Sequence, residues 1–208
     1  MKIAVVGASG KSGIKFIDLA LKNGYQIKAG INRSNKLTNK DNLEVVKCNA
    51  LNYSEIEELI SGCQVVVSLI GHGRKSPSNL QTQAISNIIK AMKKQNIRRL
   101  ISLTGTGVRK TGDKITLIDR LLNFSIKLID PKRIDDGLKH AEVIEKSDLD
   151  WTIIRVLKLH DLYESKFSLV ELGPAKVLVS RKEVAEAIIL LIKNNSFINK
   201  FPIIGKIK

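Results

Sequence analysis

The sequence is short of the residues on which several classes of protein depend. Cys48 and Cys63 are its two cysteines in 208 residues, and their spacing matches no pattern of metal ligands. We therefore expect no disulfide framework and no metal site, with both thiols buried or partly buried in a reducing compartment. There is no apolar run of about 18 residues, so no segment is expected to span a membrane. The chain also enters a strand without a signal-peptide pattern, which favours a cytoplasmic location and no membrane partner.

Aromatic and acidic residues are both few compared with basic ones. There are nine aromatic residues, and 35 Lys and Arg against 20 Asp and Glu give a net charge of +15. A charge of this size is typical of nucleic-acid binding. However, the basic residues are spread along the chain, and no aromatic side chains alternate with them as a base-stacking surface requires. The pattern favours a solvated basic surface over a nucleic-acid site, with excess charge that would draw anionic ligands toward a cleft.

The first 33 residues carry the most informative pattern. An apolar run at 2–6 predicts a buried strand, and it is followed by Gly7-Ala-Ser-Gly10-Lys-Ser-Gly13. An amphipathic helix is expected next, ending at Gly24, before a second apolar strand at 26–31. Gly7 would allow a sharp turn, Gly10 would let backbone approach a phosphate, and Gly13 would let helix and sheet pack closely. Although a tight strand–helix turn alone would also use these glycines, their context predicts a site for the pyrophosphate of a dinucleotide.

The end of the second strand indicates which dinucleotide is bound. NAD sites place a carboxylate about 20 residues beyond the glycines, on the ribose 2′-hydroxyl. This chain has Asn32-Arg33 there and no carboxylate before Asp41. A guanidinium can pair with the adenosine 2′-phosphate in two-point geometry, whereas a carboxylate would repel it. The position of Arg33 therefore favours NADP (NADPH) over NAD, with a solvated loop arginine as the alternative.

Strands and helices alternate through the rest of the chain, which predicts an α/β fold with a parallel sheet covered on both faces. Two capping boxes are expected, Ser54 with Glu57 and Ser180 with Glu183. The helix at 133–146 is expected to place Ile134, Leu138, Ala141 and Ile144 on one side. The further expected strands are 43–46, 64–70, 99–103, 150–155 and 201–204, with short β-like runs at 167–172 and 175–179, and the further helices are 54–60, 80–92, 115–128 and 184–192.

Ligands of a doubly wound sheet lie at the carboxyl ends of its strands. The turn at Asn49 and Ala50 would then lie beside an adenine ring, and the loop at Ile70 and Gly71 would border the cofactor. His72 in this loop is a candidate for catalysis, for a phosphate contact or for simple exposure.

Several of these segments together resemble one family. The segments that carry the resemblance are the opening glycine turn, Asn32-Arg33, the run from Leu43 to Asn52, the Thr104–Gly107 turn, Asp150-Trp-Thr-Ile-Ile-Arg155 and Ser180-Arg-Lys-Glu-Val-Ala185. The chain resembles atypical short-chain dehydrogenases/reductases, on the side of NmrA-like proteins and flavin- or biliverdin-reductase-like NAD(P)H-binding proteins. The resemblance covers nearly the whole chain. It implies a Rossmann-type doubly wound parallel sheet in a single domain, 1–208, with small substrate-side loops at about 108–131 and 157–179.

The resemblance also implies which residues hold the cofactor, NADP, and where this chain departs from its relatives. Asn49 stands where the family usually has Asp, and Val156 stands where Pro commonly follows the arginine. The implied cofactor-binding residues are Gly7, Ser9, Gly10, Lys11, Ser12, Gly13, Arg33, Asn49, Ala50, Ile70 and Gly71.

The catalytic pattern of the wider superfamily is missing. Its reductases use a Tyr with a Lys four residues later, but none of Tyr25, Tyr53 and Tyr163 has such a lysine. Gly105 stands where the usual serine would be, so Thr104 and Thr106 are candidate hydroxyl groups, and His140 is a candidate proton donor. The alternatives are turn-forming threonines and a packing histidine.

A flavin or quinone acceptor suits a site with no clear acid, since solvent can supply the proton. The favoured prediction is an NADP-dependent oxidoreductase acting on a small flavin-, quinone- or carbonyl-type molecule. The first alternative is a non-enzymatic NADP-binding redox sensor of the NmrA-like kind. A nucleotide-sugar epimerase or dehydratase is less favoured, since that chemistry normally needs the same tyrosine.

Overall fold

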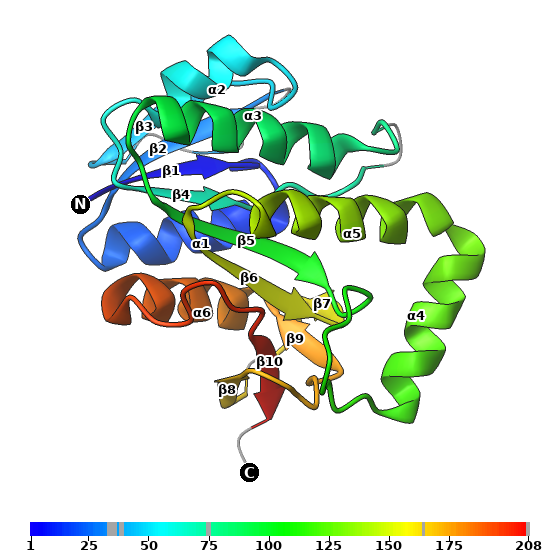
Figure 1. Ribbon diagram of the computed structural model, residues 1–208. Helices are drawn as coiled ribbons and strands as arrows, with labels where there is room; N and C mark the ends of the chain where they lie inside the picture. The colour runs from blue at the N-terminus through cyan, green and yellow to red at the C-terminus, as the bar shows by residue number, and fades with distance from the viewer. Residues whose placement is uncertain (33–36, 38–39, 74–75, 164, 207–208) are drawn as a thin grey trace.

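A computed structural model describes residues 1–32, 37, 40–73, 76–163 and 165–206. An eight-stranded sheet runs through its middle in the order β3-β2-β1-β4-β5-β6-β10-β8 (Figure 1). The strands of this sheet are β1 (Lys2–Val6), β2 (Gln26–Ile31), β3 (Leu43–Lys47), β4 (Val65–Ser68), β5 (Arg99–Gly105), β6 (Asp150–Val156), β8 (Phe167–Val170) and β10 (Ile203–Lys206). A separate pair is formed by β7 (Lys158–His160) and β9 (Leu178–Ser180).

The predicted doubly wound parallel sheet is confirmed. The first six strands and β10 pair in parallel, so the ends of β1, β2 and β4 lie together, with Val6 opposite both Gly30 and Ser68. The exception is β8, which pairs antiparallel with β10 at the edge of the sheet. This one edge aside, all carboxyl ends of the strands face the same side, where a ligand site is expected.

Helices cover the sheet on both faces (Figure 1). On one face lie α1 (Lys11–Lys22) and α6 (Arg181–Asn194), and on the other lie α2 (Tyr53–Ile60), α3 (Leu80–Lys94) and α5 (Pro131–Glu145). Each face has its own apolar core, one around Phe16 and Ile188 and the other around Ile88 and Ile144. The remaining helix, α4 (Leu117–Ile129), extends along the outer edge of the molecule beside α5.

The start of α2 differs from the predicted capping box. Asn52, not Ser54, is the N-cap: its side chain accepts from the Ser54 backbone N–H at 3.0 Å and donates to Glu55 at 2.8 Å. Glu57 instead forms an ion pair with Lys94 at 2.6 Å. Because Asn is as good an N-cap as Ser, the motif by itself did not locate the first residue of the helix. The second box is confirmed at α6, where Ser180 and Glu183 bond each other's backbone N–H groups.

The expected buried face of α5 also needs correction. Ala141 and Ile144 are buried, but Leu138 is 44% exposed. The other positions of the helix that turn inward are Asp136, Gly137 and His140. Polar contacts, described below, therefore replace part of the apolar face that periodicity predicted.

Both cysteine thiols are buried, as predicted, and burial raises the pKa of Cys48 to about 12. In the part of the chain that the structure describes, no helix is long and apolar enough to cross a membrane, and no group of His, Cys, Asp and Glu is arranged to hold a metal ion.

Candidate active site

The glycine turn brings β1, β4 and α1 into direct backbone contact. Gly7 has a φ of +84°, and a Cβ atom there would lie 2.9 Å from the backbone C and O of Leu69, at the end of β4. A Cβ atom on Gly13 would lie 2.5 Å from the backbone O of Gly7. Both distances are far below van der Waals contact, so both positions require glycine, and the first turn of α1 is held against the strand ends.

The N-terminus of α1 is open to an anion. Gly10 is the N-cap, no side chain caps the helix, and its first turn carries no acidic residue. The first N–H groups of a helix have no partner within it, and the helix dipole favours negative charge at this end. Ser12 is half-buried and Lys11 exposed at the same end. A pyrophosphate group fits this cradle.

A cleft of about 420 Å³ extends from this end of α1 along the carboxyl ends of β4, β5 and β6. Four residues of the predicted site line it: Ser12, Ile70, Gly71 and Thr104. Both predicted substrate-side loops contribute as well, the first through Val108, Asn123 and Ile126, and the second through Leu157, Lys158 and Leu159. The cleft is thus bordered at one end by the glycine turn and at the other by apolar and polar groups from α4 and α5.

The charges around the cleft are of one sign. Arg133, Lys158 and Arg181 line it, whereas no carboxylate does among the residues that the structure describes. Arg181 bonds Asp161 at 2.9 Å outside the lining, and that guanidinium lowers the pKa of the Asp161 carboxyl. The excess of cations in the lining, of which Arg181 has a carboxylate partner, favours an anionic ligand.

The two candidate threonines have different surroundings. Thr104 lines the cleft. If residue 137 carried a Cβ atom, that atom would lie 3.4 Å from the Thr104 hydroxyl, so Gly137 leaves space beside this hydroxyl. Thr106 is 1% exposed and does not line the cleft. Its hydroxyl donates to Asp119 at 3.0 Å and accepts from Asn123 at 3.0 Å. Thr106 therefore holds structure, and Thr104 is the hydroxyl that a ligand can reach.

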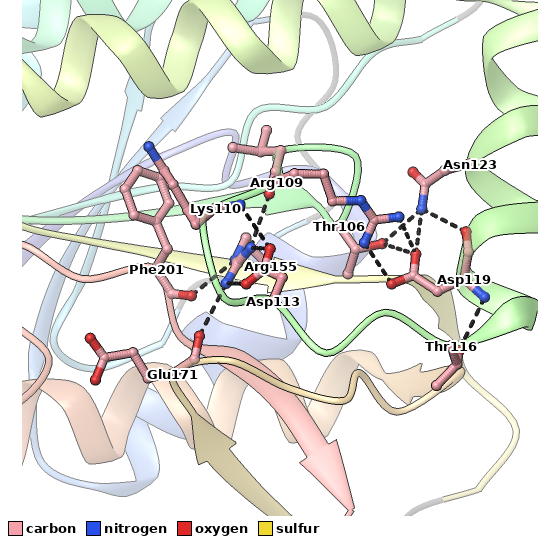
Figure 2. Close-up of polar contacts among 11 residues, drawn as sticks. Thr106, Arg109, Lys110, Asp113, Thr116, Asp119, Asn123, Arg155, Glu171 and Phe201 are labelled. Carbon is pink, nitrogen blue, oxygen red and sulfur yellow. Dashed lines mark hydrogen bonds and ion pairs between the residues drawn. The ribbon is translucent and has the colours of Figure 1, made fainter.

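The bonds of Thr106 belong to a network that anchors α4 (Figure 2). Asp119 is the buried residue of this helix, and it accepts two hydrogen bonds from Arg109, at 2.8 and 2.9 Å. Thr116 caps the helix by accepting from the Asp119 backbone N–H. Because these contacts join the turn after β5 to α4, they fix the helix that supplies Asn123 and Ile126 to the cleft.

A buried cation, Arg155, anchors the loop before α4. The side chain of Arg155, at the end of β6, is 1% exposed and pairs with Asp113, with one contact at 2.9 Å (Figure 2). It also donates to the backbone carbonyls of Phe201, Val108 and Glu171. Burial raises the pKa of Asp113, but the Arg155 and Lys110 donors outweigh it and leave that pKa below its ordinary value. One guanidinium thus joins three chain segments beneath the substrate side of the cleft.

His140 does not occupy the position expected of a proton donor. It is 2% exposed, does not line the cleft, and its Nε2 lies 3.0 Å from the Ser102 hydroxyl. Burial lowers its pKa to about 4. A buried, neutral ring within the sheet–helix interface is the packing histidine that the sequence left as the alternative.

His72 is the histidine that reaches the cleft. It lies beside Gly71, lines the cleft, and its Nε2 is 2.8 Å from the carboxylate of Asp136, which is 2% exposed. The same carboxylate accepts from the backbone N–H groups of Gln81 and Thr82 at the start of α3. Among the described residues, no hydrogen-bond partner is found for Nδ1 of His72, and this atom is not buried. The spacing of His72 and Asp136, 64 residues apart, gave no signal in the sequence.

Of the two parts of the predicted adenosine site, the structure describes the turn at Asn49 and Ala50. Asn49 forms a turn in which its side-chain oxygen accepts from the Leu51 backbone N–H at 3.2 Å, while the Ala50 carbonyl accepts from Asn87. The Asn49 side-chain oxygen therefore already accepts one hydrogen bond within the turn that is expected beside adenine. Arg33 lies outside the described residues.

This fold and glycine turn define a Rossmann-type dinucleotide-binding protein. The family model described as NAD(P)H-binding matches residues 7–195, and the chain belongs to this family. Its predicted cofactor class is thereby confirmed.

Individual relatives are distant. Protein TIC 62, chloroplastic, from Pisum sativum is 23% identical over 224 residues, which cover 92% of this chain and 40% of that protein. The chain thus spans less than half of that relative. A short-chain dehydrogenase/reductase from Veillonella parvula, solved in complex with NADP, is 18% identical with a TM-score of 0.82, covering 99% of this chain and 94% of the other. ChuY from Escherichia coli O157:H7, an anaerobillin reductase, is 18% identical with a TM-score of 0.80, covering 99% and 97%.

We expect Arg155→Met to destabilise the protein by about 3 kcal/mol, because it leaves Asp113 buried without its cation. Urea unfolding measures the change. Arg98→Met is the matched control: Arg98 is 63% exposed in its pair with Asp150, so its loss should cost at most about 1 kcal/mol. Equal costs for the two variants would contradict the anchoring role of Arg155.

His140 should make stability depend on pH. Its folded-state pKa of about 4 lies below the ordinary 6.5, so the unfolded chain takes up a proton first as the pH falls. The stability it contributes is present above about pH 6.5 and is lost toward about pH 4. Between about pH 7 and about pH 5, the wild type should lose about 2 kcal/mol more than His140→Gln, measured by urea unfolding. Parallel pH profiles would contradict the burial of a neutral ring.

Proposed function

We propose that this chain is an NADPH-dependent oxidoreductase acting on a small flavin-, quinone- or carbonyl-type molecule. The observation that carries the proposal is the single cleft that joins the α1 cradle to Thr104 and to apolar groups of both substrate-side loops. Family membership supplies the dinucleotide class. The relatives described as a reductase and as an NADP complex support the same direction, at the level of fold.

The residues divide into those that would hold the dinucleotide and those that would face its reactive end. Gly7, Gly10, Gly13 and the first N–H groups of α1 would hold the pyrophosphate, with Ser9, Lys11 and Ser12 beside it. Arg33 would pair with the 2′-phosphate. Asn49 and Ala50 would flank adenine. Ile70, Gly71 and Thr104 would border the nicotinamide end, where the bound cofactor supplies a hydride.

The reaction also needs a proton, which His72 is placed to deliver. Reduction transfers a hydride to the acceptor and adds one proton to its oxygen or nitrogen. With protons on both ring nitrogens, His72, which lines the cleft, would give up the proton on Nδ1 to the acceptor and keep its Nε2–H bond to Asp136. The carboxylate fixes the orientation of the ring throughout. His72 thus takes the role that the sequence offered to His140.

The second candidate function is an NADP-binding redox sensor that passes the state of the nucleotide to a protein partner. The absence of a Tyr with a Lys four residues later favours it. The same absence, together with a short C-terminal part, makes a nucleotide-sugar epimerase or dehydratase the least favoured. A cytoplasmic location stays a prediction.

The proposal is tested by NADPH consumption with a panel of flavins, quinones and small carbonyl compounds. We expect turnover with at least one acceptor, and NADPH favoured over NADH. Arg33→Ala should remove most of this preference, because the 2′-phosphate loses its two-point partner, by about tenfold to a hundredfold in affinity. Calorimetry with both nucleotides measures it. Binding of NADPH without any turnover, and a partner captured only in one redox state, would favour the sensor instead.

His72→Gln should lower turnover by about a hundredfold, since a general acid typically contributes this much, while NADPH affinity stays unchanged. His72→Ala should recover activity when imidazole is added, which a merely structural residue would not show. His160→Gln is the control, because His160 is a second largely buried histidine, 9% exposed, that does not line the cleft. Full activity of His72→Gln on every acceptor would mean that solvent supplies the proton.

A further inference from the structure

The outward face of α4 is the most apolar exposed surface among the described residues. Leu117, Leu121, Phe124 and Leu128 are 76%, 66%, 61% and 69% exposed, and Ile118 and Ile129 are 51% and 84% exposed. We call these six residues the α4 face. A contiguous apolar face of this kind on a surface helix marks an interaction site.

The α4 face is opposite the side that holds the helix in place. Leu117, Leu121, Phe124 and Leu128 recur at spacings of four, three and four residues, which places them in one stripe along the helix. Asp119, Asn123 and Ile126 lie on the other side, where the first two bond the turn after β5 and the last two line the cleft. The polar groups on the anchored side therefore have partners, and the apolar stripe is exposed to solvent. Figure 1 shows that α4 itself lies at the outer edge of the molecule.

The charges beside the stripe are basic. Arg120 and Lys127, seven residues apart, lie on the same flank, and neither forms an ion pair within the described residues. Lys114, Lys132, Arg133 and Lys139 are exposed nearby, against the exposed carboxylates of Asp130 and Asp135. These basic residues, close to α4 in the sequence, are part of the excess that gives the chain its net charge of +15.

These flanks argue against a second copy of the chain as the occupant. If two α4 stripes packed antiparallel, each flank would meet its own counterpart, so Arg120 and Lys127 would face the same cations on the partner helix. If they packed parallel, both cations would face Ser125 and Ile118, which offer no negative charge. Either arrangement removes water from cations without pairing them.

We propose that the α4 face docks on an anionic phospholipid surface. Such a surface accepts the apolar stripe at the boundary between headgroups and acyl chains and pairs the basic flank with phosphate groups. At 13 residues, α4 is too short to span a bilayer and would lie along it. The expectation of no membrane partner rested on the absence of a spanning segment and of a leader, and neither bears on a helix that lies on the surface. Docking would bring the α4 wall of the cleft next to the lipid.

The test is sedimentation of the whole chain with vesicles of phosphatidylcholine alone and with about 30% phosphatidylglycerol. We expect the chain to bind the anionic vesicles, and salt should weaken this binding. Binding to the neutral vesicles should be weaker by at least about tenfold. Leu121→Gln with Phe124→Gln should reduce binding at least about tenfold, and Arg120→Gln with Lys127→Gln should reduce it and weaken its salt dependence. In Phe124→Trp, the new indole fluorescence should shift to the blue on anionic vesicles alone.

Leu190→Gln on α6 is the matched control, because Leu190 is 45% exposed but lies far from this basic cluster in the chain, and it should bind like the wild type. Unchanged NADPH affinity shows that each variant is folded. The proposal is overturned if neither vesicle binds the chain, if the Leu121 and Phe124 substitutions leave binding intact, or if they abolish a concentration-dependent dimer, which would assign the α4 face to a second copy.

Discussion

The backbone contact between the first turn of α1 and the ends of β1 and β4 is the constraint on which the site depends. Gly13 allows the helix to approach the Gly7 carbonyl, and Gly7 allows the chain to turn beside Leu69. No side chain fits at either position. Because the approach is made by backbone alone, the N–H groups of the helix stay free, and the cradle exists before any ligand arrives. The cleft then follows from the parallel sheet, which aligns the ends of β4, β5 and β6 beside it.

The substrate side of the cleft is held by charge rather than by apolar packing. Arg155 joins Asp113 to the carbonyls of three segments, and Arg109 joins Asp119 to the turn after β5. Long loops have few apolar residues to bury, so hydrogen-bonded ion pairs, of the buried Arg155 and the half-buried Arg109, take over the role of a core there. This arrangement explains how α4 can present an almost entirely apolar outer face and still be fixed: its inner side depends on Asp119, not on leucines.

The two sides of the site therefore differ in how far the sequence anticipated them. The glycine turn could be predicted because its pattern is local: a strand, three glycines and a helix follow one another directly in the sequence. Thr104 and Ile70 were candidates because they follow predicted strands, and both line the cleft. His72 and Asp136 were not paired in advance, since 64 residues separate them and only the packing of α5 against α3 brings the carboxylate to the ring. Thr106 and His140 were candidates because a hydroxyl and an imidazole can take part in proton transfer. In the structure the Thr106 hydroxyl bonds Asp119 and the His140 ring bonds Ser102, and the periodicity of the sequence does not predict these buried partners.

The sequence by itself determined the α/β alternation, the opening strand–helix–strand unit and the class of ligand, because these depend on residues near one another and on backbone geometry. Only the tertiary structure decided which polar side chains reach the cleft. That outcome depends on the rotation of α5, which turns Asp136 and His140 inward and Leu138 outward, and on which strand register brings distant groups within bonding distance. The period of a helix determines which positions share a face. The elements packed against that face determine whether its side chains must be apolar or must form hydrogen bonds.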